Sequence, residues 1–378
     1  MTDERLSRID RLIDQVLAAN ASPENQRRIK IKPAISWGLE EPIASLHIFH
    51  YDIDQYFSDP VFYVEQTLRQ RLWRWEHFAR EDAPIPVDLS VWLGHYTEYP
   101  CLGLAVPYNK QGVPCIQTDH PMTRDPDLRW LEPVDFQTSG QMPFYLRFYD
   151  EVNKIVAGRL KVAFGTTWGR GCLDIAVQLR GYENWVADTG ERPQFVHDLM
   201  QFLVEQRCRW WEGYYQYSGA KREPVGIADD WINIPFISPG MFRDFVLPYY
   251  KQIEQFHGGI VSIHSCGDQT PVQKYMLELS TLQHLEISPW TNLKQTLINV
   301  PPTKRLGPFL HPNDVLLASP EEMETRLRTI VEACKGREFS IGTSGLTPIW
   351  DDIDEFVRRV QCWVEIAERV CAPIQVRG

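Results

Sequence analysis

The chain has 378 residues, of which 43% are hydrophobic and 24% are charged, and this balance is typical of a globular protein with a sizeable core. Its formal net charge of −11 argues against a polyanionic partner, so we expect no binding to nucleic acid or to an anionic membrane surface. The eight cysteines show no framework spacing, which favours reduced thiols in a cytoplasmic protein over disulfides.

The N-terminal region, residues 1–40, is expected to be a helical extension. Residues 1–20 are charged and have the pattern of an amphipathic helix, without the apolar stretch of a secretory signal. No apolar run in the sequence is long enough to span a bilayer. We therefore expect a cytoplasmic protein with no membrane span.

The first half of the chain offers few strands. Apolar runs at residues 44–49 and 85–91 predict two strands, and about residues 60–80 between them predict a helix. Residues 118–140 are polar and contain prolines, which indicates a long excursion rather than a domain boundary.

The second half alternates short apolar runs with helical patterns, which favours βα units and a parallel sheet. Ser238 and Pro239 predict the start of one helix, and Ser319 and Pro320 predict the start of another, where Glu322 completes a capping box. The predicted strands are residues 161–167, 224–229, 258–264, 282–288 and 337–343.

These units fit either a barrel or an open doubly wound sheet. No glycine-rich nucleotide-binding turn follows a predicted strand, which weakens the open sheet. We therefore predict an α/β fold, a (β/α)₈ (TIM) barrel over residues 41–378. In such barrels the reactive groups lie at the C-terminal ends of the strands.

A histidine and a cysteine stand two residues apart where the strand at 258–264 ends. Residues i and i+2 of an extended chain face the same side, so His264 and Cys266 can converge on one ion. Imidazole and thiolate together suit zinc, although such a pair also arises by chance. Glu286 ends the next predicted strand and is a candidate third ligand; a strand-end glutamate paired with an arginine is the alternative.

Acidic and basic residues follow two other predicted strands. Asp230 is a candidate for acid–base catalysis, with a helix-capping aspartate as the alternative. Arg170 lies between two glycines and is well placed to hold a substrate carboxylate through two hydrogen bonds. Arg180 is a second candidate for this role, with a helix-surface charge as the alternative.

Further residues near predicted strand ends are candidates for binding a small-molecule substrate. His95 and Tyr96 follow an early strand, and Trp168 and Trp231 offer aromatic walls. Ser344 lies between glycines in a turn that could cradle an anion or be a simple turn.

Several of these motifs occur together in a recognisable order. Residues 227–267 read IADDWINIPFISPGMFRDFVLPYYKQIEQFHGGIVSIHSCG: an acidic strand end, a helix that begins with S-P, and a strand that ends in H-x-C-G. LASPEEMETRLRTIVEA and IGTSGLTP follow later in the chain. This succession resembles the uroporphyrinogen decarboxylase superfamily over roughly residues 85–370, and the resemblance implies its (β/α)₈ barrel.

The resemblance implies methyl transfer as one chemistry. In corrinoid-linked and thiol-linked methyltransferases of the superfamily, zinc held by an H-x-C pair activates a thiol or another heteroatom; His264 and Cys266 match the pair, and Glu286 fits the acid. A later cysteine of that family falls at Ser344, and serine is a poor zinc ligand. The site then has three ligands and an open position, holds another metal, or has lost its metal. The chain has no D-x-H-x-x-G pattern, so a corrinoid would come from a partner carrier protein.

Decarboxylation is the alternative chemistry. True uroporphyrinogen decarboxylases need no metal or cofactor and carry an N-terminal arginine-rich signature, a variant of R-Q-A-G-R, which this sequence lacks. A zinc-dependent methyltransferase is therefore favoured. A cofactor-free decarboxylase of uroporphyrinogen or another carboxylated substrate, using Arg170 and Asp230, is the second hypothesis, and a non-catalytic binding protein is the third. Relatives are often dimers, which leaves a homodimer open.

Overall fold

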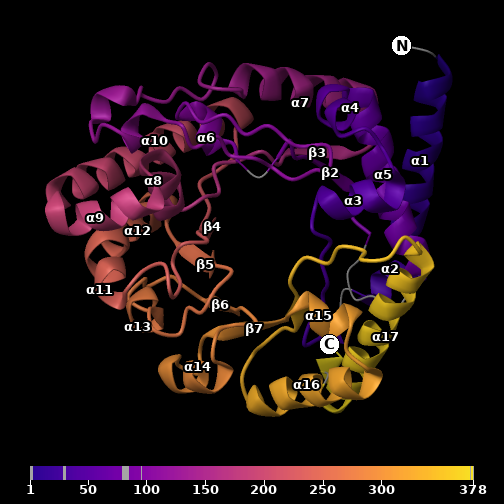
Figure 1. Ribbon diagram of the computed structural model, residues 1–378. Coiled ribbons are helices and arrows are strands. Elements are labelled where there is room, and N and C mark those ends of the chain that lie inside the picture. The colour runs from indigo at the N-terminus through magenta and orange to yellow at the C-terminus, as the bar shows by residue number, and fades with distance from the viewer. Residues whose placement is uncertain (1–2, 29–30, 79–84, 95, 375, 378) are drawn as a thin grey trace.

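A computed structural model describes residues 3–28, 31–78, 85–94, 96–374 and 376–377. Its strands form the inner part of a ring, and most of its helices lie on the outer side (Figure 1). The described helices are α1 (Asp3–Ala21), α2 (Pro23–Arg28), α3 (Ile43–Phe49), α4 (Ile53–Ser58), α5 (Pro60–His77), α6 (Glu98–Cys101), α7 (Met142–Val156), α8 (Cys172–Arg180), α9 (Tyr182–Glu191), α10 (Pro193–Ser218), α11 (Pro239–Met241), α12 (Leu247–His257), α13 (Gln273–Met276), α14 (Leu293–Asn299), α15 (Pro312–Leu316), α16 (Pro320–Ala333) and α17 (Ile353–Cys371).

Most of the described strands run parallel. β4 to β8 form one five-stranded parallel sheet in chain order, β2 pairs in parallel with β3, and β1 pairs antiparallel with β9. The strands are β1 (Ile31–Lys32), β2 (Asp88–Val91), β3 (Lys161–Phe164), β4 (Val225–Ala228), β5 (Ile260–His264), β6 (His284–Ile287), β7 (Arg305–Leu310), β8 (Gly342–Thr343) and β9 (Val376–Arg377).

Isolated pairings extend the parallel order beyond these strands. Arg170 pairs with Ala228, so the chain that leaves β3 continues beside β4. The segment at residues 35–39 pairs in parallel with residues 341–346, so it lies beside β8. The described residues thus give a TIM-barrel-like succession of parallel segments, without a recorded pairing between residues 35–39 and β2. A division of the chain at residue 40 would separate the segment at residues 35–39 from its partner.

Two helix starts confirm the predicted capping. The Ser238 hydroxyl accepts a hydrogen bond from the Met241 N–H at 3.1 Å. Ser319 and Glu322 form both hydrogen bonds of a capping box, at 3.3 and 2.8 Å. Such bonds satisfy N–H groups that the first turn of a helix leaves without partners. The caps therefore fix where α11 and α16 begin.

Two strand assignments from the sequence are wrong. Residues 44–49 were predicted as a strand but belong to α3, where Glu40 and Pro42 carbonyls accept the first helical hydrogen bonds. A short apolar run does not distinguish a strand from a buried helix. The sequence analysis also missed β7, because Gly307 and Pro308 argue against a central strand. The room left by Gly307 accommodates the His284 imidazole, which a Cβ atom would overlap. The other six predicted strands each contain an observed strand.

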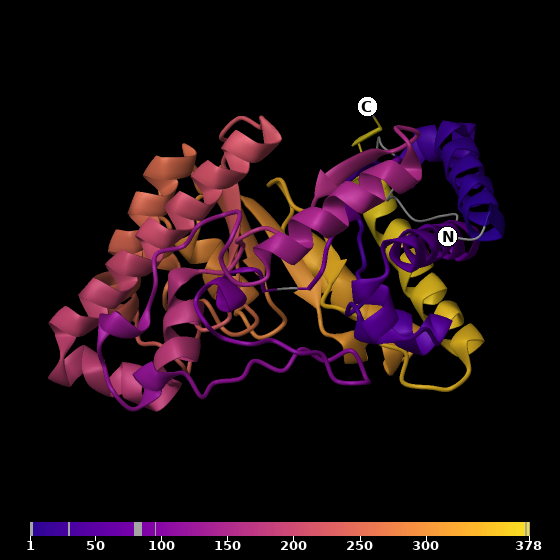
Figure 2. The same cartoon turned by 90° about the horizontal axis from the view of Figure 1, so that it is seen from above.

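The ends of the described chain lie on one side of the molecule. α1, α5 and α17 are grouped there in both views (Figures 1 and 2), and α1 packs against α5. The opposite side is built from α8 to α12 (Figure 2). No helix in the described ranges is long and apolar enough to cross a membrane.

Candidate functional site

Three neighbouring strands bring four predicted residues together at their C-terminal ends. β4 pairs with β5 so that Ala228 lies opposite His264, and Asp230 follows two residues later. The register of β5 with β6 places Glu286 beside His264. Cys266 comes two residues after His264, as the alternation of an extended chain requires for side chains on one side.

Asp230, His264 and Cys266 form a compact triangle of ligand atoms. Cys266 Sγ lies 3.2 Å from Asp230 Oδ1 and 3.4 Å from His264 Nε2. His264 Nε2 lies 3.5 Å from Asp230 Oδ1. Among the described residues, these three form the group of histidine, cysteine and acidic side chains that could hold a metal ion.

The dimensions of this triangle fit zinc. Zinc bonds of about 2.0–2.3 Å in tetrahedral geometry place the ligand atoms roughly 3.3–3.5 Å apart. The three observed separations, 3.2, 3.4 and 3.5 Å, are close to that range. One thiolate, one imidazole and one carboxylate are also ligands that zinc accepts.

Glu286, which the sequence suggested as a third ligand, lies beside the triangle rather than in it. Glu286 Oε1 lies 2.5 Å from His264 Nδ1, on the opposite edge of the ring from Cys266. It therefore accepts a hydrogen bond from Nδ1 and leaves the lone pair of Nε2 available for a metal. Asp230, which the sequence suggested as a catalytic acid, occupies the third corner instead.

The protonation states of the triangle depend on one another. Burial opposes a charged His264, but hydrogen bonds with Cys266 and Glu286 raise the pKa of His264 to about 10. The hydrogen bond with His264 lowers the pKa of Cys266, yet burial and the Asp230 charge leave that pKa above its usual value. Burial raises the pKa of Asp230, but Arg170 outweighs burial and holds the pKa below its usual value. Without a metal, His264 is therefore protonated and forms ion pairs with Asp230 and Glu286.

Arg170 lies beside the triangle but is already paired. Its Nη1 donates hydrogen bonds to Asp174 Oδ2 at 3.0 Å and to Asp230 Oδ2 at 2.6 Å. Its guanidinium also lies over the Tyr96 ring, 4.8 Å from the ring centroid. Because two carboxylates neutralise it, Arg170 is not the free carboxylate receptor that the sequence suggested; it fixes the position of Asp230.

Two buried residues that the sequence analysis missed hold the Arg170 backbone. Glu98 Oε1 accepts a hydrogen bond from the Arg170 N–H at 2.6 Å, and Arg207 Nη1 donates one to the Arg170 carbonyl at 2.9 Å. Both side chains are fully buried, and burial raises the pKa of Glu98 to about 7. They come from α6 and α10, where no sequence motif marks them, so only the folded structure shows their role.

Asp229 is another buried carboxylate, and it holds the start of α8. Asp229 accepts hydrogen bonds from the Tyr250 hydroxyl at 2.6 Å and from the Asp174 N–H at 3.3 Å. Burial and repulsion by Asp174 raise the pKa of Asp229 to about 8. A Cβ atom on Gly171 would overlap Asp229 and Tyr250, which explains the second glycine of the W-G-R-G sequence.

The glycine of H-x-C-G has a similar steric role. A Cβ atom on Gly267 would overlap the Asn233 side chain. Asn233 Nδ2 in turn donates hydrogen bonds to the Asp230 carbonyl at 2.5 Å and to Ser265 Oγ at 3.1 Å. The small residue thus lets the loop after β4 approach the loop after β5 and brings Asp230 close to Cys266.

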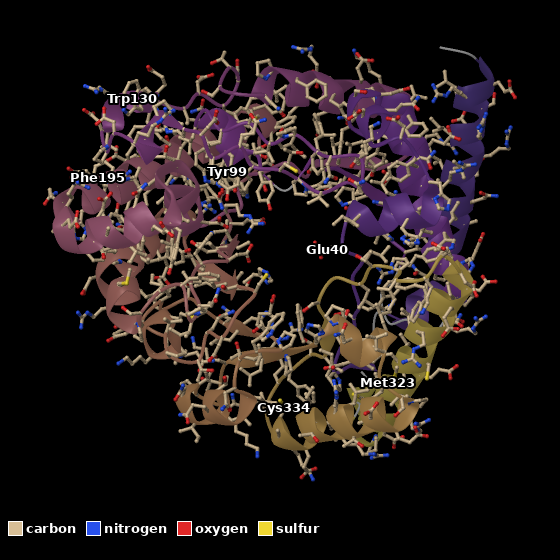
Figure 3. All side chains as sticks on the ribbon, viewed as in Figure 1. Glu40, Tyr99, Trp130, Phe195, Met323 and Cys334 are labelled. Atoms are coloured by element: carbon tan, nitrogen blue, oxygen red, sulfur yellow. The ribbon has the colours of Figure 1, made fainter. Side chains whose placement is uncertain are left out.

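A cavity of about 760 Å³ opens over Asp230 and Cys266, a size that suits a small molecule. Its charged lining residues are one arginine and three aspartates, Asp174, Asp230 and Asp268, and the arginine is already paired with two of these acids. Tyr99, which lines the cavity, lies on the inner side of the ring, whereas Trp130 and Phe195 lie on its outer side (Figure 3). The described lining residues are Tyr96, Tyr99, Ile116, Arg170, Asp174, Gln178, Asp230, Trp231, Asn233, Ile234, Phe236, Cys266, Gly267, Asp268 and Trp290.

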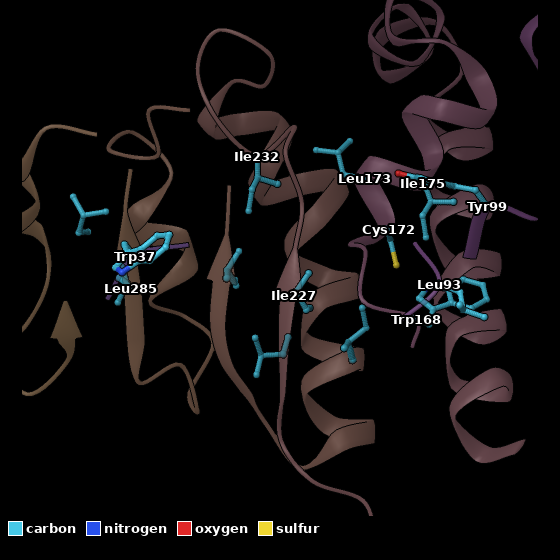
Figure 4. Close-up of a cluster of buried hydrophobic side chains, with 14 of the residues drawn as sticks. Trp37, Leu93, Tyr99, Trp168, Cys172, Leu173, Ile175, Ile227, Ile232 and Leu285 are labelled. Atoms are coloured by element: carbon cyan, nitrogen blue, oxygen red, sulfur yellow. The ribbon is translucent and has the colours of Figure 1, made fainter. Parts of the chain in front are cut away.

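The predicted substrate-binding residues separate into two groups. Tyr96 and Trp231 line the cavity. His95 lies outside the described residues. Trp168 is fully buried and packs in the hydrophobic cluster that also contains Leu93 and Cys172 (Figure 4), so it is part of the core rather than a wall of the cavity.

Arg180 and Ser344 have structural partners away from the cavity. Arg180 Nε donates to Asp188 Oδ2 at 2.7 Å, and its Nη1 donates to the carbonyls of Met122 and Thr123 at 3.0 and 2.7 Å. It therefore holds the excursion at residues 118–140 against α8. The Ser344 N–H donates to the Leu310 carbonyl, which continues the pairing of β7 with β8.

Comparison with known proteins identifies the family. Residues 50–347 match the family described as uroporphyrinogen decarboxylase (URO-D), and because this match covers most of the chain, the protein belongs to that family. A methyltransferase from Methanosarcina mazei has a similar fold, with a TM-score of 0.65 at 15% identity over 94% of this chain and 98% of that chain. The comparison with curated protein sequences found no match.

Proposed function

We propose that this protein is a zinc-dependent methyltransferase that acts on a small molecule. The triangle of Asp230, His264 and Cys266 at the cavity carries the proposal, because its donor atoms and spacing suit zinc and two of its residues line the cavity. With three protein ligands, the fourth position would face the cavity. Zinc held by the triangle would act as a Lewis acid and lower the pKa of a thiol or hydroxyl bound to it.

The residues around the triangle would prepare it for this role. Glu286 holds the Nδ1–H tautomer of His264, so that Nε2 points toward Cys266. Arg170 fixes one carboxylate oxygen of Asp230, while the other oxygen faces the thiol. Tyr99 and Trp231 contribute aromatic walls to the cavity next to the triangle.

The methyl group could come from or go to a corrinoid on a partner carrier protein. The fold is similar to that of a methyltransferase, and the cavity opens to the surface of the protein. The sequence contains no cobalamin-binding D-x-H-x-x-G pattern, so the proposal requires a separate carrier.

Metal-free decarboxylation is the second candidate, favoured by the family match. The charges of the cavity disfavour a substrate with many carboxylates, because three aspartates outnumber the single arginine. Repulsion between like charges in a partly buried cavity opposes binding of such a substrate.

Metal content and methyl transfer test the proposal together. Elemental mass spectrometry of the purified protein is expected to give about one zinc per chain, as a single three-ligand site requires. Cys266→Ala should lose the zinc, whereas Cys362→Ala, on α17, should retain it. The zinc-loaded protein should demethylate free methylcobalamin when a small thiol is added, and this is followed by absorbance. Metal-free protein that decarboxylates a carboxylated substrate would contradict the proposal, and full function of both His264→Ala and Cys266→Ala would favour a non-catalytic binding protein.

A further inference from the structure

A second cavity lies near the N-terminal ends of β7 and β8. Its volume is about 300 Å³. Arg305 begins β7, and residues 335–339 connect α16 to the β8 region. Its lining includes Arg305, Lys335, Arg337 and Glu338.

This cavity is separate from the candidate metal site. The metal-site residues follow the C-terminal ends of parallel strands, whereas Arg305 is the first residue of β7. The six residues of β7 span roughly 16–20 Å. Cys334, next to Lys335 in the sequence, lies across the ring from Tyr99 in Figure 3. A ligand in one cavity therefore does not touch the residues of the other.

The charges around the second cavity are not balanced. Three cationic side chains, Arg305, Lys335 and Arg337, line it together with one acid, Glu338. Lys335 also pairs with Glu332, but this pair is exposed and long, at 3.4 Å. In the described part of the chain, no carboxylate forms an ion pair with either arginine of the cavity.

Two guanidinium nitrogens of the cavity residues are buried without hydrogen-bond partners. They are Arg305 Nε and Arg337 Nη1. Arg337 Nη2 does have a partner, the Val300 carbonyl at 3.1 Å, which fixes the direction of this guanidinium. Buried polar groups are usually satisfied, and these two donors have no partner among the described residues.

We propose that this cavity binds a small oxyanion through the guanidinium groups of Arg305 and Arg337. Arginine donors suit the oxygens of carboxylate and phosphate groups, because two N–H groups can bind two oxygens at once. Lys335, which is exposed, adds a third positive charge to the lining. The ligand class is therefore a small molecule that carries one phosphate or carboxylate group, bound at the end of the strands opposite the metal site.

Isothermal titration calorimetry with inorganic phosphate, in chloride buffer of constant ionic strength, tests the proposal. We expect saturable binding at about one site per chain, and acetate in place of phosphate will distinguish the two oxyanion classes. Arg305→Gln and Arg337→Gln should each weaken binding by roughly tenfold or more, because each removes a charge-assisted hydrogen bond. Glu338→Gln should strengthen binding, since it removes the negative charge at the cavity.

The matched control is Arg328→Gln on α16. Arg328 is exposed and bonds to Glu324 of the same helix, so its loss removes a positive charge without touching the cavity. Retained binding in this variant, together with weaker binding in the two cavity variants, would support the site. Absence of saturable binding of both anions, or equal weakening in all three arginine variants, would overturn it. Because Glu338→Gln has the opposite expected sign, misfolding of an arginine variant does not decide the result.

This inference does not depend on the proposed methyl transfer. Zinc content and anion binding are measured separately, and Cys266→Ala should leave phosphate binding unchanged. Loss of zinc with retained phosphate binding would therefore show that the two sites are independent.

Discussion

Arg170 lies two residues before α8 and Arg180 is the last residue of α8, and they make the same kind of interaction with different consequences. Each is mostly buried and forms a short ion pair with an aspartate. Arg170 lines the cavity and holds Asp230, whereas Arg180 binds two carbonyls of the excursion at residues 118–140. Burial and pairing alone therefore do not identify a functional arginine. The contacts of its partner, at the cavity or away from it, make the distinction.

The largest predicted effect comes from the structural arginine. Arg180→Met leaves Asp188 with one exposed partner, Arg192. It also removes the donor of the Met122 carbonyl and leaves the Thr123 carbonyl with Asn184 alone. Breaking a buried ion pair in this way costs about 3–5 kcal/mol. Urea denaturation should show this loss in the free energy of unfolding, while zinc affinity of the folded protein stays at the wild-type value. A variant as stable as wild type would contradict the role given to Arg180.

Arg170→Met should lower zinc affinity as well as stability, because it also leaves the buried Asp174 without its ion pair. Without the guanidinium, Asp230 loses the hydrogen bond that fixes its position, and supporting partners of metal ligands are typically worth 10–100-fold in affinity or activity. We expect zinc affinity to fall within that range when measured by competition with a chelator. Wild-type affinity in this variant would remove the distinction between the two arginines.

Glu286→Gln tests whether Glu286 orients His264 or binds the metal itself. If Glu286 only orients His264, the amide can still accept the Nδ1 hydrogen bond, and zinc affinity should fall by about tenfold. Glu278→Gln, on the surface and paired with Lys251, is the matched control and should not change the affinity. Complete loss of zinc would instead show that Glu286 is a ligand, as the sequence suggested.

The smallest effect concerns protons. The pKa of His264 is raised to about 10, so the protonated ring stabilises the metal-free fold fully below about pH 6.5, and this stability is lost as the pH rises through the folded value. Zinc must displace this proton and that of Cys266. Calorimetry in buffers with different ionisation enthalpies should therefore report release of about two protons per zinc near neutral pH. Zinc binding without proton release would contradict the assigned states.

The sequence predicted which side chains meet at these strand ends, because local spacing marks them. The i and i+2 spacing of His264 and Cys266 follows from strand geometry, and the position of Asp230 follows from a strand end. Glu286 was found for the correct reason, its neighbouring strand, but which ring nitrogen it reaches depends on side-chain placement that no spacing encodes.

The surroundings of the site could not be predicted in the same way. Glu98 and Arg207 reach the Arg170 backbone from helices far apart in the sequence, and neither has a motif around it. The sequence suggested Trp168 as a wall of the substrate cavity, because tryptophan often lines pockets, yet it belongs to the core. β7 was not predicted, because Gly307 and Pro308 are unfavourable in a central strand. In the structure, His284 packs tightly against Gly307, and this segment forms a strand.

Zinc-edge X-ray absorption of the zinc-loaded protein tests the central claim most directly. The account predicts one sulfur neighbour at about 2.3 Å and nitrogen or oxygen neighbours at about 2.0–2.1 Å, from Cys266, His264 and Asp230. The sulfur contribution should disappear in Cys266→Ala and remain in Cys362→Ala. A spectrum with two or more protein sulfur ligands, or with no sulfur at all in the wild-type protein, would contradict a metal centre built on this triangle.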